Sequence, residues 1–315
     1  MAVIAIVGAG LIGRAWAITF ARAGHEVRIY DAFVGAADKA KEFATEALSP
    51  LAVEDLLDGQ SVEQVAARLK SVPTLAAALV DAAYVQENTP EDLASKKLVF
   101  AQLDAAAAPD TILASSTSAL LPSYFTADLA GRARCLVVHP INPPYLIPAA
   151  EIVPAPWTAP EAIDRTRRLL AAVGQSPIVM RREIDGFVMN RLQGALLEEA
   201  FRLVADGYAS VEDVDIGIRE GLALRWSFMG PFETIDLNAP GGVRDYVARY
   251  QKVYERLFPS MQRRVDWAGP VLATVEDERR ARVPEAGLQK RQAWRDRRLM
   301  ALAAHKRKAA GEIGS

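Results

Sequence analysis

Hydrophobic residues near the start of the chain follow two patterns in succession. The β-branched run Val3–Val7 predicts a buried strand, and apolar residues at helical spacing follow a glycine-rich turn as far as Gly24. A second apolar run, Glu26–Tyr30, predicts another strand, which ends at Asp31. Strand, turn, helix and strand in this order predict one βαβ unit.

The alternation of strand and helix patterns continues to about residue 185. Short apolar runs predict strands at 83–85, 111–114, 135–138, 151–153 and 177–180, and helical stretches at 92–107, 120–129 and 160–173 separate them. Such alternation predicts an α/β fold, a Rossmann-type, mostly parallel, doubly wound sheet. The stretch 36–71 predicts two helices, with a break at Pro50, that lie across the sheet edge.

From Val188 onward the pattern is helical, with Leu192, Leu196 and Phe201 on one apolar face. The change predicts two domains: a Rossmann-type α/β domain over 1–185, and an all-α domain over 186–315. The arginine-rich stretch 276–308 predicts a solvated helical face and a frayed tail.

Composition narrows the classes of function. The 315 residues carry 37 Lys and Arg against 39 Asp and Glu, a balance that argues against a nucleic-acid partner. The one cysteine, Cys135, forms no intrachain disulfide and belongs to no metal-binding cluster, so we expect a reduced, cytoplasmic protein without a metal. No apolar run reaches membrane-spanning length, and the apolar start lacks a basic leader, so we expect no membrane partner.

The turn Gly8–Gly13 has the spacing of a dinucleotide-binding motif, with Leu11 and Ile12 between its last two glycines. Gly8 permits a tight turn, Gly10 lets the backbone approach a pyrophosphate, and Gly13 allows close packing of helix on strand. Asp31 follows 18 residues after Gly13, where a carboxylate binds the ribose hydroxyls and repels a 2′-phosphate. The motif therefore predicts NAD rather than NADP.

Hydride transfer from an alcohol also needs a proton acceptor. Of the three histidines, His25 precedes a strand and His305 lies in the charged tail, which leaves His139 in the proline-rich loop after a strand. The ordinary pKa of a histidine lies near neutrality, which suits a general base, and Glu151, twelve residues later, is a candidate to orient the ring. Considered alone, the spacing of this pair favours coincidence over a functional pair.

Hydroxyl and amide side chains form two further candidate groups. Ser115–Ser118 follow a strand, where such residues bind ligands or simply cap the next helix. Asn190 lies one turn into the helix after Asp185-Gly186-Phe187 and either contacts substrate or stabilises the helix start.

The order of these motifs resembles the 3-hydroxyacyl-CoA dehydrogenase superfamily over nearly the whole chain. Within it the sequence is most similar to the lambda-crystallin branch, the L-gulonate 3-dehydrogenases. The segments that carry the likeness are His139–Pro148, Gly186–Gln193, Glu220–Leu222 with Arg225, and Arg291–Asp296. Acyl-CoA members tend to carry a His-Phe-Phe-Asn-Pro loop, and here Pro140 and Ile141 replace the two aromatic residues.

The resemblance implies a catalytic role for four residues. Ser118 would donate to the substrate oxygen, His139 would act as general base, Glu151 would be its partner, and Asn190 would position the substrate and His139. It also implies a homodimer formed through the helical domain.

Other residues would lie on the cofactor side. The resemblance implies that Glu87 and Lys96 lie near the cofactor, with the adjacent Lys97 as an alternative to Lys96. We add Ser116, from the run Ser115–Ser118, as a candidate cofactor contact.

On the substrate side, Asn142 of the proline-rich loop is a candidate contact. Arg225 is a candidate clamp for a carboxylate, because a guanidinium binds a carboxylate through two hydrogen bonds; the alternative is a surface arginine.

Together these features predict NAD-dependent oxidation of the 3-hydroxyl of a small 3-hydroxy acid, L-gulonate to 3-dehydro-L-gulonate. The first alternative keeps the chemistry on 3-hydroxybutyryl-CoA or on carnitine, whose quaternary ammonium would need an aromatic cage for which Trp226 and Phe228 are candidates. The second alternative is a non-catalytic, crystallin-like NAD-binding protein, against which the retention of the four catalytic candidates argues.

Overall fold

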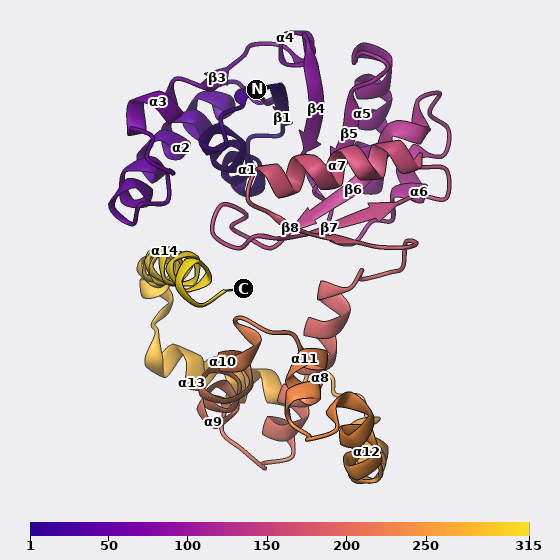
Figure 1. Ribbon diagram of the computed structural model, residues 1–315, viewed down its shortest axis with the longest axis vertical. Helices are drawn as coiled ribbons and strands as arrows, with labels where there is room; N and C mark the ends of the chain where they lie inside the picture. The colour runs from indigo at the N-terminus through magenta and orange to yellow at the C-terminus, as the bar shows by residue number, and fades with distance from the viewer. Residues whose placement is uncertain (315) are drawn as a thin grey trace. The chain divides into compact units, whose positions relative to one another are not determined.

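The computed structural model describes residues 1–314 and divides into two compact units. Residues 1–189 with 296–304 form the first unit, and residues 190–295 with the last residues of the chain form the second. The first unit has an α/β fold and the second is helical, as the sequence predicted (Figure 1).

One eight-stranded sheet organises the first unit. Its order is β3-β2-β1-β4-β5-β6-β7-β8, and all neighbouring strands are parallel except β6 and β7, which are antiparallel. The strands are β1 (Val3–Val7), β2 (Glu26–Tyr30), β3 (Leu69–Ser71), β4 (Ala82–Glu87), β5 (Ile112–Ser115), β6 (Cys135–Pro140), β7 (Ala149–Pro154) and β8 (Ser176–Val179). The chain order reverses between β1 and β4, the point at which ligands bind in sheets of this kind.

Helices cover both faces of the sheet. Alternate residues of β1 serve the two cores: Ile4 and Ile6 pack with α1, α2 and α7, whereas Ala5 and Val7 pack with α4, α5 and α6. This alternation is the pleat of a strand buried on both faces. The helices are α1 (Leu11–Arg22), α2 (Ala36–Val53), α3 (Val62–Ala66), α4 (Leu75–Leu79), α5 (Leu93–Ala106), α6 (Pro122–Thr126) and α7 (Pro160–Ala172), with a 3₁₀ turn η1 (Arg132–Arg134).

The region 36–71 differs from its prediction. Helix α2 continues through Pro50 to Val53, because Leu48 and Leu51 on either side of the proline are fully buried and hold the last turn in place. The edge strand β3 was not expected. Its three residues carry little apolar pattern, and the strand forms by pairing with β2, Leu69 opposite Val27.

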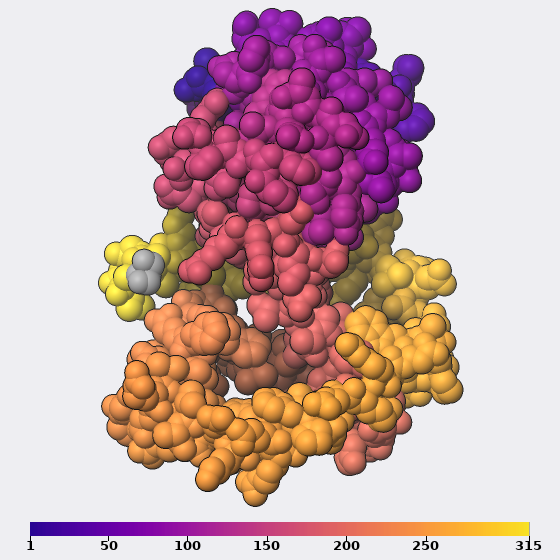
Figure 2. Space-filling view, turned by 90° about the vertical axis from the view of Figure 1, so that its right-hand side faces the viewer, coloured from indigo at the N-terminus to yellow at the C-terminus, as the bar shows by residue number. Residues whose placement is uncertain are grey.

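The chain is helical from residue 189 onward, and these elements form the second unit except for Met189 and residues 296–304. They are α8 (Met189–Ala205), α9 (Val211–Ile216), the π-helical turn η2 (Gly217–Leu222), α10 (Ala223–Trp226), α11 (Pro231–Leu237), α12 (Gly242–Met261), α13 (Pro270–Arg282), the 3₁₀ turn η3 (Glu285–Gly287) and α14 (Leu288–Ile313). In the space-filling view of Figure 2 the atoms of this unit, drawn mainly in orange, leave a hollow among them. Within residues 1–314, no helix combines the length and the apolar character that crossing a membrane requires.

The arginine-rich stretch 276–308 is largely helical and mostly exposed, as predicted, but the prediction of a frayed tail is wrong. Helix α14 is regular to Ile313, and residues 296–304 belong to the first unit. Met300 is buried in the α1–α2–α7 core cluster, and Leu299 and Ala303 pack against the same cluster. The charges of this segment obscured a short apolar stripe at helical spacing.

Cys135 begins β6 and is fully buried. Burial raises the pKa of its thiol to about 12, with a further contribution from the nearby Asp104 carboxylate that Arg134 opposes. At pH 8 about one thiol in ten thousand is therefore the reactive thiolate.

We expect Cys135 to resist a thiol reagent such as Ellman's reagent at pH 8 while the protein is folded. In guanidinium chloride the same reagent should label one thiol per chain within minutes. Rapid stoichiometric labelling in native buffer would contradict the burial of this residue.

Candidate active site

The three glycines of the turn between β1 and α1 differ in what a side chain would meet. Gly8 has φ +92°, and a Cβ there would lie 2.7 Å from the carbonyl carbon of Asn88. A Cβ on Gly13 would lie 1.9 Å from the Gly8 carbonyl oxygen, whereas a Cβ on Gly10 would meet only open space. Gly8 and Gly13 are thus required by the fold, and Gly10 is required only if something else approaches the turn.

The N-terminus of α1 indicates what could approach the turn at Gly10. No side chain caps this helix, so the first N–H groups, at Leu11 and Ile12, have no capping partner from a side chain. Free helix N–H groups next to an open glycine are a binding site for a phosphate group. The turn therefore fits the pyrophosphate of a dinucleotide.

Asp31 lies beside this turn at the end of β2. Its Oδ2 accepts a hydrogen bond of 2.6 Å from the backbone N–H of Ala9, and its Oδ1 accepts one of 2.8 Å from Phe33. A cavity of about 380 Å³ next to it is also lined by Asp38, whose carboxylate accepts a hydrogen bond from Ser71. Two carboxylates in one cavity favour ribose hydroxyls and disfavour a 2′-phosphate. The sequence pattern alone did not single out Asp38.

Ser116 lies at the centre of a buried network at the carboxyl edge of the sheet. Its Oγ accepts hydrogen bonds from Trp16 Nε1 at 3.1 Å and Gln86 Nε2 at 2.7 Å, and donates one to Asn88 Oδ1 at 2.7 Å. Burial raises the pKa of Tyr84 well above its usual value, so its hydroxyl remains a donor to Gln86 Oε1 at 2.6 Å and orients that amide. These bonds use the one donor and both acceptor positions of Ser116. In this arrangement its hydroxyl has no further hydrogen bond to offer a cofactor.

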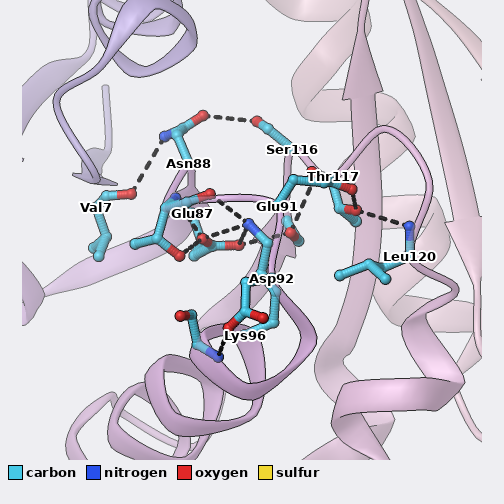
Figure 3. A network of polar contacts seen from close by, with 12 residues as sticks. Val7, Glu87, Asn88, Glu91, Asp92, Lys96, Ser116, Thr117 and Leu120 are labelled. Atoms are coloured by element: carbon cyan, nitrogen blue, oxygen red, sulfur yellow. Dashed lines mark hydrogen bonds and ion pairs between the residues drawn. The ribbon is translucent and has the colours of Figure 1, made fainter.

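Glu87 and Lys96 form a buried ion pair close by (Figure 3). Lys96 Nζ lies 2.8 and 2.9 Å from the two Glu87 oxygens and donates a third bond to the Thr89 carbonyl. Ser115 also donates to Glu87, at 2.6 Å. Lys97 is exposed, so the pairing distinguishes it from Lys96. The ion pair joins the end of β4 to α5, and the hydrogen bond from Ser115 adds the end of β5.

Ser118 lies in the exposed turn that follows β5. Its backbone N–H donates to Glu91 Oε1 at 3.1 Å, and the same oxygen accepts hydrogen bonds from the Thr117 hydroxyl and the Ala119 N–H. Nothing in the spacing of the sequence drew attention to Glu91.

His139 and Glu151 are brought together by the sheet. The antiparallel register of β6 and β7 places the two residues opposite each other, and Nδ1 of His139 lies 2.7 Å from Oε2 of Glu151. Both side chains are buried, Glu151 fully. A carboxylate only accepts hydrogen bonds, so Nδ1 carries the proton and Nε2 is left as the basic nitrogen of the neutral ring.

The second oxygen of Glu151 is also engaged. Oε1 accepts hydrogen bonds from the backbone N–H groups of Val188 at 2.6 Å and Met189 at 2.9 Å, at the start of α8. The preceding Phe187 packs its ring 5.5 Å from that of His139, centroid to centroid, with a left-handed backbone at φ 51°. A non-glycine residue in that region stores strain, which buried packing of this kind sustains. The His139 ring is thus held at Nδ1 by Glu151 and is packed against the ring of Phe187.

Asn142 follows His139 in the proline-rich loop. Its Oδ1 is buried and has no hydrogen-bond partner among residues 1–314. A buried acceptor without a partner costs free energy, and a bound donor would remove that cost.

The remaining candidates belong to the helical unit. Asn190 is the second residue of α8, directly after Met189. Arg225 is exposed on α10 and donates to Asn238 Oδ1 at 3.2 Å, while Trp226 and Phe228 are also exposed. Among residues 1–314, no group of three or more His, Cys, Asp or Glu side chains is arranged to hold a metal ion.

Comparison with known sequences identifies the family to which the chain belongs. The NAD binding domain of 3-hydroxyacyl-CoA dehydrogenase matches residues 3–184, and the C-terminal domain of the same family matches residues 186–270. The chain belongs to the 3-hydroxyacyl-CoA dehydrogenase family. It is therefore an NAD-dependent dehydrogenase that oxidises the hydroxyl of a 3-hydroxy acid, which confirms the predicted chemistry and cofactor.

The known proteins that resemble this chain differ in how much of it they cover. The chain is 42% identical to a lambda-crystallin homolog of Bos taurus over 95% of this chain and 94% of that one. It is also 42% identical to an L-carnitine dehydrogenase of Streptomyces griseus, over 74% of this chain and 69% of that one. Among solved structures, an NAD⁺-dependent 5-formyl-3-hydroxy-2-methylpyridine 4-carboxylic acid 5-dehydrogenase superposes with a TM-score of 0.80 at 28% identity, covering 96% and 97% of the two chains.

The glycine turn gives a test that separates fold from cofactor binding. We expect Gly10→Ala to leave the melting temperature within about 2 °C of wild type but to weaken NAD binding about tenfold or more, because the added methyl group meets no protein atom but occupies the approach to the turn. Gly13→Ala should lower the melting temperature by several degrees, because its Cβ collides with backbone.

Thermal unfolding and NADH fluorescence titration of the two variants measure both effects. Unchanged NADH affinity in Gly10→Ala would show that the pyrophosphate does not approach this turn.

Proposed function

We propose that the protein oxidises the 3-hydroxyl of L-gulonate to give 3-dehydro-L-gulonate. The observation that carries the catalytic assignment is the buried pair of His139 and Glu151, with Nδ1 held at 2.7 Å. A histidine with one nitrogen bound to a carboxylate and the other available is suited to take a proton from an alcohol.

In the proposed reaction His139 Nε2 removes the proton of the 3-hydroxyl group. The C3–H bond breaks with both electrons, and the C3–O bond becomes a carbonyl. NAD, when bound, supplies the acceptor for that hydride. The imidazolium that forms lies against the carboxylate of Glu151, which stabilises its positive charge at short range in a buried site.

Three polar residues are proposed to hold the substrate. Ser118, in the exposed turn after β5, donates to the 3-oxygen, and Asn142 offers its unpartnered Oδ1 to a substrate hydroxyl. Asn190 is assigned a second contact to the same oxygen. This assignment is supported by the position of Asn190 in the chain: the residue before it, Met189, donates its N–H to Glu151, the partner of His139.

The choice of a sugar acid rests on three observations. The likeness to the lambda-crystallin homolog extends over nearly the whole of both chains, further than the likeness to the carnitine dehydrogenase. Pro140 and Ile141 stand where acyl-CoA enzymes tend to have aromatic residues. Arg225 is exposed on α10, and we assign its guanidinium to the carboxylate of the substrate.

One experiment distinguishes L-gulonate oxidation from two alternative functions. Carnitine is the first, because its dehydrogenases are among the relatives and because Trp226 and Phe228 are exposed aromatic residues. A non-catalytic NAD-binding role is the second, and the ordered His139–Glu151 pair argues against it.

An NADH-formation assay with four substrates tests the proposal. L-Gulonate, L-carnitine, 3-hydroxybutyrate and 3-hydroxybutyryl-CoA are compared side by side, and we expect the highest kcat/KM with L-gulonate. His139→Gln should lower kcat by about 10²–10⁴-fold, the usual contribution of a general base.

His305→Gln is the matched control, because His305 is exposed on α14 and the variant should retain wild-type kcat. Turnover of the thioester or of carnitine alone would reject the sugar-acid assignment. Full activity in His139→Gln would reject the assigned base.

We also propose that the protein is a homodimer formed through the helical unit. Among residues 190–295, all of which the structure describes, the buried ones are Arg202, Val211, Thr234, Ala239 and Val271. So small a core does not stabilise a unit of this size. Helix α12 exposes an apolar stripe at helical spacing that a second copy of the same helix would cover: Val243, Val247, Tyr250, Tyr254, Leu257 and Met261.

Sedimentation velocity tests the dimer. We expect the wild type to sediment as a dimer and the double variant Val247→Asp/Leu257→Asp as a monomer, because two carboxylates would be buried without partners. Lys252→Glu, on the opposite face of α12, should remain dimeric. A monomeric wild type at micromolar concentration would reject the proposal.

We assign the enzyme to the cytoplasm, on the ground that its one cysteine is a buried, unpaired thiol that needs no oxidising compartment. Fractionation of cells that express the protein would test this, and recovery in a secreted fraction would contradict it.

A further inference from the structure

The residue before β8, Gln175, is held by the end of α7. Gly174, with φ +81°, ends that helix, and the Gln175 N–H donates to the Leu170 carbonyl at 2.9 Å, as in a Schellman cap. Strand β8 is parallel to β7, and β7 is antiparallel to β6, so β8 begins at the edge of the sheet where β6 ends. Gln175 is therefore a fixed point at the edge where His139 lies.

The side chain of Gln175 reaches the proline-rich connection 141–148. Its Nε2 donates to the Pro144 carbonyl at 2.9 Å, and the N–H of the next residue, Ser176, donates to the Pro148 carbonyl at 2.7 Å. A carbonyl oxygen only accepts hydrogen bonds, so the contact with Pro144 fixes which way the amide of Gln175 faces. Two consecutive residues thus hold the connection at its middle and at its end.

The orientation that serves Pro144 leaves the other half of the Gln175 amide without a partner. Gln175 is 5% exposed, and its Oε1 is buried and has no hydrogen-bond partner among residues 1–314. A buried acceptor in this state destabilises a fold, and an apolar side chain of similar shape would avoid that cost. An amide at this position is therefore explained by its hydrogen bond to Pro144 rather than by packing.

Pro144 belongs to a closed turn that begins beside Asn142. The Pro143 carbonyl accepts hydrogen bonds from the N–H groups of Leu146 and Ile147, both at 3.0 Å. Because these bonds tie residues 143–147 together, a shift at the Pro144 carbonyl moves the turn as a unit and displaces Asn142 at its start. Gln175 thus controls where the buried Asn142 Oδ1 lies.

We propose that Gln175 is a positioning residue that places Asn142 for its hydrogen bond to a substrate hydroxyl other than the 3-hydroxyl. This inference rests on the contact given to Asn142 in the proposed function. Gln175 acts through the Pro144 carbonyl and contacts neither substrate nor cofactor. His139 belongs to β6 rather than to the turn, so Gln175 affects substrate binding and not proton transfer. It favours polyhydroxylated acids over 3-hydroxy acids that have no second hydroxyl.

Steady-state kinetics with L-gulonate test the proposal. We expect Gln175→Met, which is similar in length and has no amide, to raise KM about two- to tenfold, the contribution of one hydrogen bond between neutral groups. The kcat and its pH profile should stay close to wild type, as should the Kd for NADH measured by fluorescence. Gln175→Leu should give the same result, so the test does not depend on the folding of one variant.

Gln60→Met is the matched control. Gln60 Nε2 donates to the Arg22 carbonyl at 2.7 Å, so the same substitution removes the same kind of hydrogen bond away from the connection 141–148. This variant should keep the wild-type KM for L-gulonate, and thermal unfolding of all the variants shows whether each is folded at the assay temperature. An equal rise of KM in Gln60→Met would show a general loss of stability and would overturn the proposal.

Asn142→Ala shows whether Gln175 acts through Asn142. If it does, the double variant Gln175→Met/Asn142→Ala has a KM no higher than that of Asn142→Ala alone. Effects on KM that multiply, a wild-type KM in Gln175→Met, or a loss of kcat with KM unchanged would overturn the role of Gln175 and leave that of Asn142 intact. A wild-type KM in Asn142→Ala, or no turnover of L-gulonate by the wild type, would instead reject the proposed function of this site, and the role of Gln175 with it.

Discussion

The buried carboxylate of Glu151 is the interaction on which the site depends. It is fully shielded from solvent, a costly place for a charge, and it is tolerated because three donors satisfy it: the His139 ring through one oxygen, and the Val188 and Met189 N–H groups through the other. The same group therefore selects the tautomer of the base and anchors the first turn of α8. Losing it would leave the ring free to rotate and two N–H groups without a partner, so the orientation of the base and the start of the helix are coupled.

The parallel sheet gathers the other polar groups at its carboxyl edge, but for different tasks. Ser115, Ser116, Thr117 and Ser118 are adjacent in sequence, yet Ser115 and Ser116 are turned inward and bind Glu87 and Asn88, whereas Ser118 is exposed. The ion pair of Glu87 with Lys96 belongs with the inward group. Buried polar contacts thus support a turn in which Ser118 is exposed.

Sequence reasoning predicted those parts of the molecule that depend on local pattern. The glycine turn, Asp31 and most of the strands follow from residue spacing, and His139 became the candidate base because the chain has only three histidines. Its partner was a guess at a spacing of twelve, and the antiparallel register of β6 and β7 turned that spacing into a contact. What the sequence concealed depends on tertiary contacts: strand β3 exists because β2 offers an edge, α2 passes Pro50 because its flanking leucines are buried, and Glu91 accepts a hydrogen bond from Thr117, 26 residues away.

The register of β6 and β7 has a consequence for how such a site changes over time. Because the backbone ladder sets His139 opposite Glu151, the separation of the two side chains does not depend on the course of residues 141–148 that connect the strands. That connection can change in sequence, and even in length, without moving His139 from Glu151. In the proposed mechanism the proton chemistry rests on the two strands, so the connection is free to vary while the His139–Glu151 pair stays in register.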